Sequence, residues 1–279
     1  MVNRSSLEYM YTDVVLPRHP PPAMPRITAK AATQSHVPPL NKGLSTTRSN
    51  ALHTIFYDGP LSLWEGFAQY AEDDDKARVW RKPSIRLEEQ NDAFREEQFV
   101  VGDESGAQSR FTQHYGEELS RIFEAQGIDL VFSDFKCAGV PYANIPDTVI
   151  MDSSRRLKVV GEIKVPWVLQ HQSSLQFEYP HALRQIFAQP IQYMQDLNCT
   201  YGFYTTYDET VFLRQILVDG IWQIQYSPVI LAESCYRKTS PLSTLSVSVK
   251  QCFLYVASLS VYEPPITYYL AQPTWVRHL

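Results

Sequence analysis

Asp147, Glu162 and Lys164 have the residue types and the spacing that could support hydrolysis of a phosphodiester bond. Glu162 and Lys164 lie two residues apart in an apolar stretch, so in a β-strand their side chains point to the same face. If the chain turns near Ser154, symmetric pairing places Asp147 opposite position 161 or 162, with Cβ atoms about 5 Å apart. Two carboxylates at that separation can bind one Mg²⁺ or Mn²⁺ ion, which keeps several of its waters.

Each of these groups has a defined task in such a site. A bound divalent ion lowers the pKa of a nucleophilic water and offsets the charge of the phosphate. The backbone carbonyl of Ile163 could be a further ligand, because hard cations accept carbonyl oxygens. Lys164 would hold the attacking water and stabilise the charge of the transition state. Taken alone, however, a Glu-x-Lys pair on a strand is most often a surface ion pair that contributes little.

The elements around these residues predict a mixed α/β fold with a central sheet flanked by helices. Apolar residues recur at helical spacing in 109–126, which Gly127 should end, and in 181–197, where Pro190 should cause a kink. Alternating or apolar stretches predict strands at 128–135, 145–151, 157–165, 201–207, 210–218 and 221–226. Ser240-Pro241 is typical of a helix start, and that helix should end near Leu259.

Pro146-Asp147 followed by Glu162-Ile163-Lys164 resembles the signature of the PD-(D/E)XK nuclease superfamily. The resemblance covers about residues 109–226, and 159–167 looks like a fungal branch of that superfamily. It implies a restriction-endonuclease-like core in the order helix, three strands, helix, strand. It also implies a nuclease that uses Mg²⁺ or Mn²⁺ and acts on DNA or RNA.

The same resemblance suggests further site residues. In the superfamily a Glu on the helix before the Asp strand often joins the metal site, and here Glu117 or Glu118 fits, with Glu117 preferred. The exonuclease branch carries Gln-x-x-x-Tyr on the later helix, which Gln189 and Tyr193 match. With the intervening Gln192, these residues would contact water, metal or nucleic acid. The alternative is that they only cover the polar edge of the sheet.

The charge of the chain divides unevenly between its two ends. The chain has 279 residues and a net charge of −5. Residues 1–50 are rich in Pro, Ser and Thr, with six basic residues against two acidic ones, and are predicted to form a disordered or extended arm. Residues 51–279, predicted to be one nuclease-like domain, therefore carry −9. This balance disfavours a protein that coats nucleic acid through bulk charge, but it is compatible with a narrow basic groove.

Other motifs are missing from the sequence. The four cysteines and seven histidines show no zinc-ligand spacing, and no glycine-rich loop for a nucleotide cofactor occurs. The start of the chain lacks a secretory signal, and no apolar stretch is long enough to span a membrane. We therefore expect an intracellular protein, nuclear or cytoplasmic.

Three hypotheses remain open from the sequence. The chain could be an active nuclease, or a nuclease-like domain that has lost activity and binds a protein or nucleic acid. The intact set of Asp147, Glu162 and Lys164 favours the enzyme. A protein of unrelated fold is the third, and there the two carboxylates would not converge.

Overall fold

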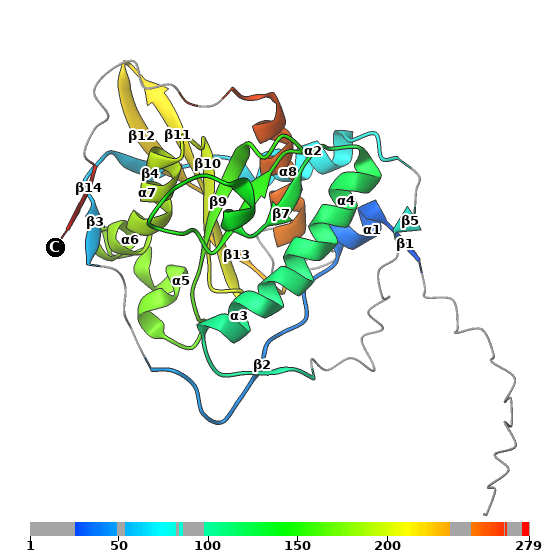
Figure 1. Cartoon of the computed structure of the whole chain (residues 1–279), viewed down its shortest axis with the longest axis horizontal. Helices are drawn as coiled ribbons and strands as arrows, with labels where there is room; N and C mark the ends of the chain where they lie inside the picture. Colours follow the sequence, from blue (N-terminus) through cyan, green and yellow to red (C-terminus); the bar gives the residue numbers. More distant parts are fainter. Residues whose placement is uncertain are drawn as a thin grey trace, which may run out of the picture.

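A mixed eight-stranded sheet organises the computed structural model (Figure 1). The structure describes residues 26–48, 54–81, 84–85, 98–234, 247–264, 266 and 275–278. The strand order is β4-β12-β11-β10-β9-β8-β7, and β13 also pairs with β11. Strand bounds are β4 Leu61–Leu63, β7 Val131–Ser133, β8 Thr148–Met151, β9 Leu157–Ile163, β10 Tyr201–Thr205, β11 Glu209–Val218, β12 Ile221–Tyr226 and β13 Ile230–Leu231.

The strands β7, β8 and β9 form an antiparallel meander, and β10 then pairs in parallel with β9. The parallel pairing requires a crossover, which helices α5 Ser173–Gln176, α6 Pro180–Ile186 and α7 Ala188–Asp196 provide. The order helix, three strands, helix, strand is therefore present. The predicted mixed α/β class is confirmed.

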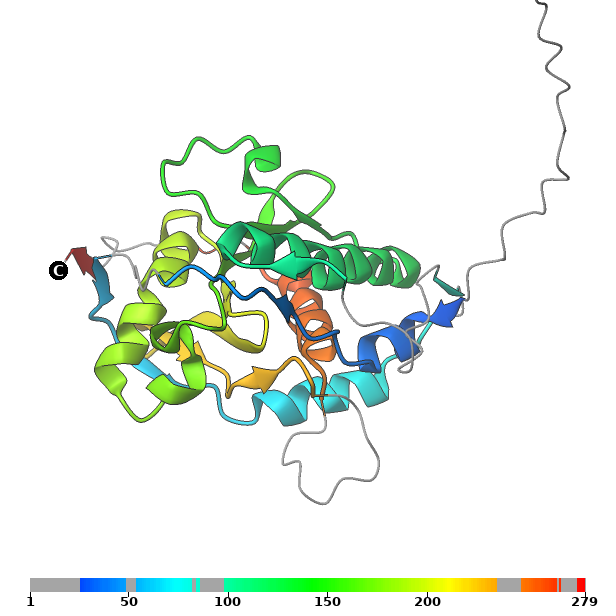
Figure 2. The ribbon, with the colours of Figure 1, turned by 90° about the horizontal axis from the view of Figure 1, so that it is seen from below.

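Helices cover both faces of the sheet, and consecutive strand residues alternate between two apolar clusters. Val159 and Phe203 belong to the cluster beneath the long helix and α8, whereas Val160 and Tyr204 belong to the cluster beneath α6 and α7. Figure 2 shows α8 Val249–Tyr262 between the long helix and α2 Phe67–Ala77, with α6 apart from them. Buried aromatic rings dominate the first cluster, including Phe111, Tyr115, Phe212 and Phe253.

The long helix before the meander begins earlier than the sequence predicted. It comprises α3 Glu104–Phe111, a π-helical turn η1 Thr112–Glu117 and α4 Glu118–Gln126. Asp103 caps it by accepting the N–H of Gly106 at 2.8 Å. It ends, as predicted, at Gly127, whose φ of +68° is the left-handed conformation that glycine adopts readily.

The predicted helix over 181–197 is two helices that meet at Phe187. Pro190 has no N–H to donate to the carbonyl of Ile186, so a single α-helix cannot continue through this point. Pro190 instead lies in the first turn of α7, where a missing N–H costs little. The interruption is confined to Phe187, three residues before the proline: its N–H donates to the carbonyl of Leu183, and its own carbonyl accepts the N–H of Ile191.

The prediction of a disordered or extended arm is wrong for residues 26–48. These residues form β1 Ile27–Thr28, α1 Ala29–Gln34 and β2 Asn41–Lys42, and the side chains of Ala32, Val37 and Leu40 are buried in the core. Short apolar residues give little periodic signal, and only their partners in α4 and α8 make α1 stable. Residues 1–25 and 49–50 of the predicted arm lie outside the described residues.

Outside the central sheet, the remaining short strands pair in twos. Strand β3 Ile55–Tyr57 pairs with β14 Val276–His278, β5 Ser84–Ile85 with β1, and β6 Val100–Val101 with β2. The 3₁₀ turns are η2 Phe135–Ala138 and η3 Leu169–His171. Helix α8 begins at a capping box of Ser248 and Gln251, while the predicted start at Ser240-Pro241 lies outside the described residues. In the described part of the chain, no helix is long and apolar enough to cross a membrane.

Candidate functional site

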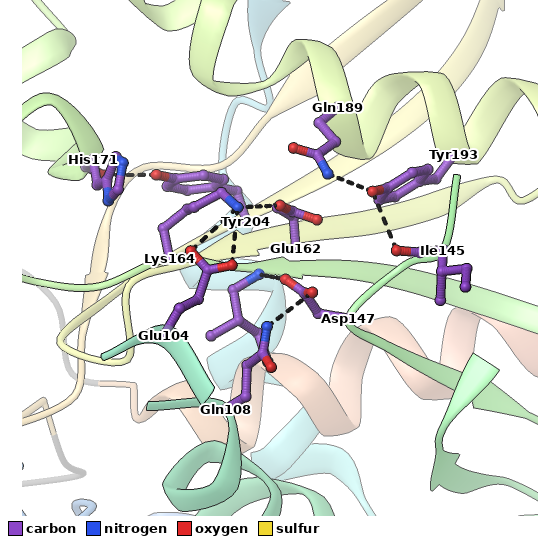
Figure 3. Close-up of polar contacts among 11 residues, drawn as sticks. Glu104, Gln108, Ile145, Asp147, Glu162, Lys164, His171, Gln189, Tyr193 and Tyr204 are labelled. Carbon is purple, nitrogen blue, oxygen red and sulfur yellow. Dashed lines mark hydrogen bonds and ion pairs between the residues drawn. The ribbon is translucent and has the colours of Figure 1, made fainter. Parts of the chain in front are cut away.

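The β8–β9 hairpin brings Asp147 and Glu162 to opposite positions. Thr148 pairs with Gly161, so one further step along the same register places Asp147 opposite Glu162. Asp147 Oδ2 also accepts the backbone N–H of Ile163 at 2.7 Å, which fixes the carboxylate against the end of β9 (Figure 3). Of the two pairings that the sequence allowed for Asp147, the structure has the one with position 162.

Glu162 and Lys164 share a face of β9, as predicted, and their side chains meet. Lys164 Nζ lies 2.6 Å from Glu162 Oε1, and the backbone N–H of Lys164 donates to the carbonyl of Thr205 on the neighbouring strand. This backbone bond extends the β9–β10 pairing by one residue. The side chains of Glu162 and Lys164 therefore lie at the end of the two central parallel strands.

Glu162 is a buried carboxylate with unused bonding capacity. Its exposed fraction is only 1%. Lys164 Nζ contacts Oε1 as an ion pair, and among the described residues Oε2 has no hydrogen-bond partner. Burial, followed by the repulsion of Asp147, raises the pKa of Glu162 to about 8. Such a group is stabilised by any additional positive charge that reaches it.

The pKa of Asp147 is raised less than that of Glu162. Burial raises the pKa of Asp147 to about 6, while the amide of Ile163 and the charge of Lys164 oppose the shift. Its Oδ1 accepts the side-chain amide of Gln108 at 2.9 Å. Each carboxylate oxygen has a second lone pair, so these bonds do not exhaust the capacity of Asp147 to bind a cation.

Lys164 is held in the charged state. Burial, the largest single effect, lowers the pKa of Lys164, but Glu162, Glu104 and Asp147 together outweigh burial and the net shift is upward. Both oxygens of Glu104 lie 3.4 Å from Nζ. The ammonium group is thus a fixed positive charge in contact with two carboxylates.

Glu104 and Gln108 are site residues that the sequence analysis missed. They lie one helical turn apart on α3, so both side chains point to the carboxylates (Figure 3). The signal that could have found them is Asp103, which caps Gly106 three residues later and marks a helix start before the apolar periodicity begins.

Glu117, the residue preferred for the metal site, lies outside this group of carboxylates. Its side chain is 58% exposed and pairs with Arg121 at 3.5 Å. It lies in the π-helical turn, where the spacing of side chains differs from that of an α-helix, so the α-helical pattern did not predict its direction. Glu118, the alternative, forms an ion pair with the buried Lys250. Glu104, further toward the start of the same long helix, is the glutamate that contacts Lys164, at 3.4 Å.

The predicted pair on the later helix does face the site. The amide of Gln189 donates to the hydroxyl of Tyr193, which in turn donates to the carbonyl of Ile145 at 3.4 Å. Burial and the nearby charge of Glu162 raise the pKa of Tyr193, so its hydroxyl stays protonated. Gln192 lies on α7 without a hydrogen bond that joins it to this group, and its predicted substrate contact stays a prediction.

A buried histidine lies behind Lys164. The hydroxyl of Tyr204, the residue paired with Glu162 across β9 and β10, donates to the carbonyl of His171 at 2.9 Å. Burial and then the charge of Lys164 lower the pKa of His171, so the imidazole is neutral. These two side chains form the inner wall of the site.

A cleft of about 830 Å³ opens beside Asp147. It runs between the long helix and the β7–β8 edge of the sheet, and Gln108 lines it together with Asp147. A ligand in this cleft would therefore reach the carboxylates from the side of the helix.

Asp147 and Glu162 suit one hard divalent cation that keeps most of its waters. They do not suit a metal ion whose ligands all come from the protein. Among the described residues, no group of three or more His, Cys, Asp or Glu side chains is spaced to hold a metal ion. Mg²⁺ typically takes one or two carboxylates and keeps its waters, a requirement that Asp147 and Glu162 can meet. The backbone N–H of Ile163 already bonds Asp147, so the backbone at Ile163 lies next to this carboxylate.

Comparisons of the chain with protein-family models, with curated proteins and with solved structures find no match. The resemblance to the PD-(D/E)XK superfamily stays a prediction from the sequence.

Proposed function

We propose that this protein is a metal-dependent phosphodiester hydrolase that acts on nucleic acid. The observation that carries the proposal is the pairing of Asp147 with Glu162 at the end of β9, beside the buried ammonium of Lys164. Even with Lys164 beside them, both carboxyl groups keep raised pKa values, and an additional cation would stabilise their charged forms. Sites with such shifts are disproportionately functional.

Asp147, Glu162 and the carbonyl of Ile163 would hold Mg²⁺ or Mn²⁺. The ion would activate a bound water and offset charge on the scissile phosphate. Glu104 lies next to the same group and would reach the ion through a water.

Lys164 has the position and charge state for transition-state stabilisation. When a cation satisfies Glu162, the ammonium loses its closest partner and can turn one N–H to the attacking water or to a phosphate oxygen. Glu104, 3.4 Å away, keeps Nζ near the site during this exchange. Removing a single such donor typically lowers kcat by about 10²–10³.

Gln189 and Tyr193 would contact substrate. Their shared hydrogen bond fixes a protonated phenol at the wall of the site. A hydroxyl in this position can donate to a phosphate oxygen, and the amide can accept or donate according to the group it meets.

The decisive experiment is cleavage of single- and double-stranded DNA and RNA by the purified protein with Mg²⁺ or Mn²⁺. We expect activity that EDTA abolishes and that Lys164→Ala and Glu162→Ala each lower by at least about 100-fold. Gln192→Ala on the same helix face tests the remaining predicted contact.

Cleavage that persists in Lys164→Ala and Glu162→Ala would refute the proposal. Absence of cleavage, with Mn²⁺ binding retained, would favour the alternative of an inactive domain that binds nucleic acid or protein. The net charge of −5 is the observation that favours a protein partner in that case.

A further inference from the structure

The cleft beside Asp147 has walls made by regular elements. On one side are Thr112, Gly116 and Glu117 of the π-helical turn, and on the other are Ser133 of β7 and Thr148 of β8. Its volume, about 830 Å³, is within the range of sites that bind small molecules. One end contains Asp147, so the cleft is continuous with the proposed catalytic group.

Direct bonds fix the helix to the sheet edge along this cleft. The Ser120 hydroxyl donates to the carbonyl of Gly116 at 2.7 Å and accepts the N–H of Phe132 at 3.0 Å. The π-helical turn departs locally from the hydrogen-bond pattern of an α-helix, and such turns are frequent at functional sites. The cleft is therefore preformed and does not depend on a loop closing over it.

The charge of the lining is unfavourable to phosphate groups. Glu117, Asp134 and Asp147 contribute carboxylates, whereas Arg121 is the one basic residue among those that line the cleft. Arg121 already pairs with Glu117. Duplex DNA carries one charge per about 1.7 Å of its axis, so tracking a duplex requires many cationic side chains. This cleft suits a neutral, polar group.

The uncharged lining atoms suit a nucleoside. Hydroxyls of Thr112, Ser133 and Thr148 and the amide of Gln108 can donate to or accept from the hydroxyls of a sugar and the edge of a base. Phe132, whose ring packs against Phe123 and Phe253 of the core, is also among the lining residues.

We infer that this cleft binds one nucleoside of a single-stranded nucleic acid, next to the phosphate at the Asp147–Glu162 pair. The inference rests on the proposed function and specifies its substrate: a single strand or an unpaired end, and not a continuous duplex. Because few phosphates are neutralised, the salt dependence should be shallow. With about one or two phosphate contacts, affinity should fall less than tenfold between 50 and 200 mM salt.

The test is to fill the cleft without changing the carboxylates. Thr112→Trp puts a large side chain into the cleft, and Gln113→Trp, on the adjacent exposed position that does not line it, is the matched control. Substrates are a single-stranded oligonucleotide, its duplex, and bis(4-nitrophenyl) phosphate, a diester without a nucleoside. We expect Thr112→Trp to raise KM for the single strand by about tenfold or more, and Gln113→Trp to leave that KM unchanged.

Four outcomes would overturn the inference. They are equal KM values for wild type and Thr112→Trp, an equal loss in Gln113→Trp, preference for the duplex, or a steep salt dependence. If wild type hydrolyses neither the oligonucleotide nor the small diester, the proposed function fails separately. In that case, fluorescence anisotropy of a labelled single strand tests the inference. A nucleoside site in the cleft requires that Thr112→Trp bind the strand more weakly than Gln113→Trp.

Discussion

Replacing Glu162 by Gln should remove a large pH-dependent cost from the stability of the metal-free protein. Glu162 has a pKa of about 8 in the folded chain against 4.5 for an exposed glutamate. Because the folded-state pKa is the higher one, the native state holds the proton more tightly than the unfolded state. The stabilisation from protonated Glu162 is fully present below pH 4.5 and is lost progressively as the pH rises toward 8.

The expected magnitude follows from the size of the shift. Each pKa unit corresponds to about 1.36 kcal/mol, so between pH 4.5 and 7 the loss is roughly 3 kcal/mol. Glu162 is 1% exposed, which leaves little water to screen this cost. Gln has nearly the same shape and no titrating proton, so Glu162→Gln should not show the loss.

Urea unfolding followed by tryptophan fluorescence measures the effect. In EDTA, the free energy of unfolding of wild type minus that of Glu162→Gln should fall by roughly 3 kcal/mol from pH 4.5 to 7. Glu117→Gln, at an exposed position, is the control for loss of one negative charge. A difference that stays constant, or that rises with pH, would refute the placement of Glu162 as a buried carboxyl with a raised pKa.

Three further predictions concern the metal, the helix carboxylate and the packing of β9. Apparent Mn²⁺ affinity, measured by calorimetry, should rise about tenfold per pH unit between pH 6 and 8, because binding displaces a proton from Glu162; a pH-independent affinity would contradict this. Glu104→Gln should lower kcat by about tenfold, since Glu104 lies 3.4 Å from Lys164. Glu117→Gln, at the surface, should leave kcat unchanged. Equal effects of the two variants in steady-state assays would contradict a role for Glu104 in the site. Gly161→Ala should destabilise the protein by about 1–3 kcal/mol in thermal unfolding, because the new Cβ would lie 2.1 Å from the ring of Phe203. Gly116→Ala is the control: its Cβ would make only an ordinary contact at 3.5 Å, so it should not destabilise the protein.

The sequence determined the local parts of the site through short-range rules. Strand alternation placed Glu162 and Lys164 on one face, and the length of the turn after Met151 fixed the approach of Asp147. The four-residue spacing of Gln189 and Tyr193 placed both on one side of a helix, even though Pro190 divided the predicted helix. These features depend on neighbours in the chain or across one hairpin, so their periodicity is readable without a fold.

Only the tertiary structure decided which helix residues join the carboxylates and how deeply Glu162 is buried. The π-helical turn departs from the α-helical period, which leaves Glu117 at the surface while Glu104 and Gln108, before the turn, face the site. Helix α1 of residues 26–48 likewise packs against α4 and α8, far along the chain, and β1 and β2 pair with β5 and β6. Burial and its effect on pKa arise from the sum of such distant contacts, and no local pattern of residues encodes that sum.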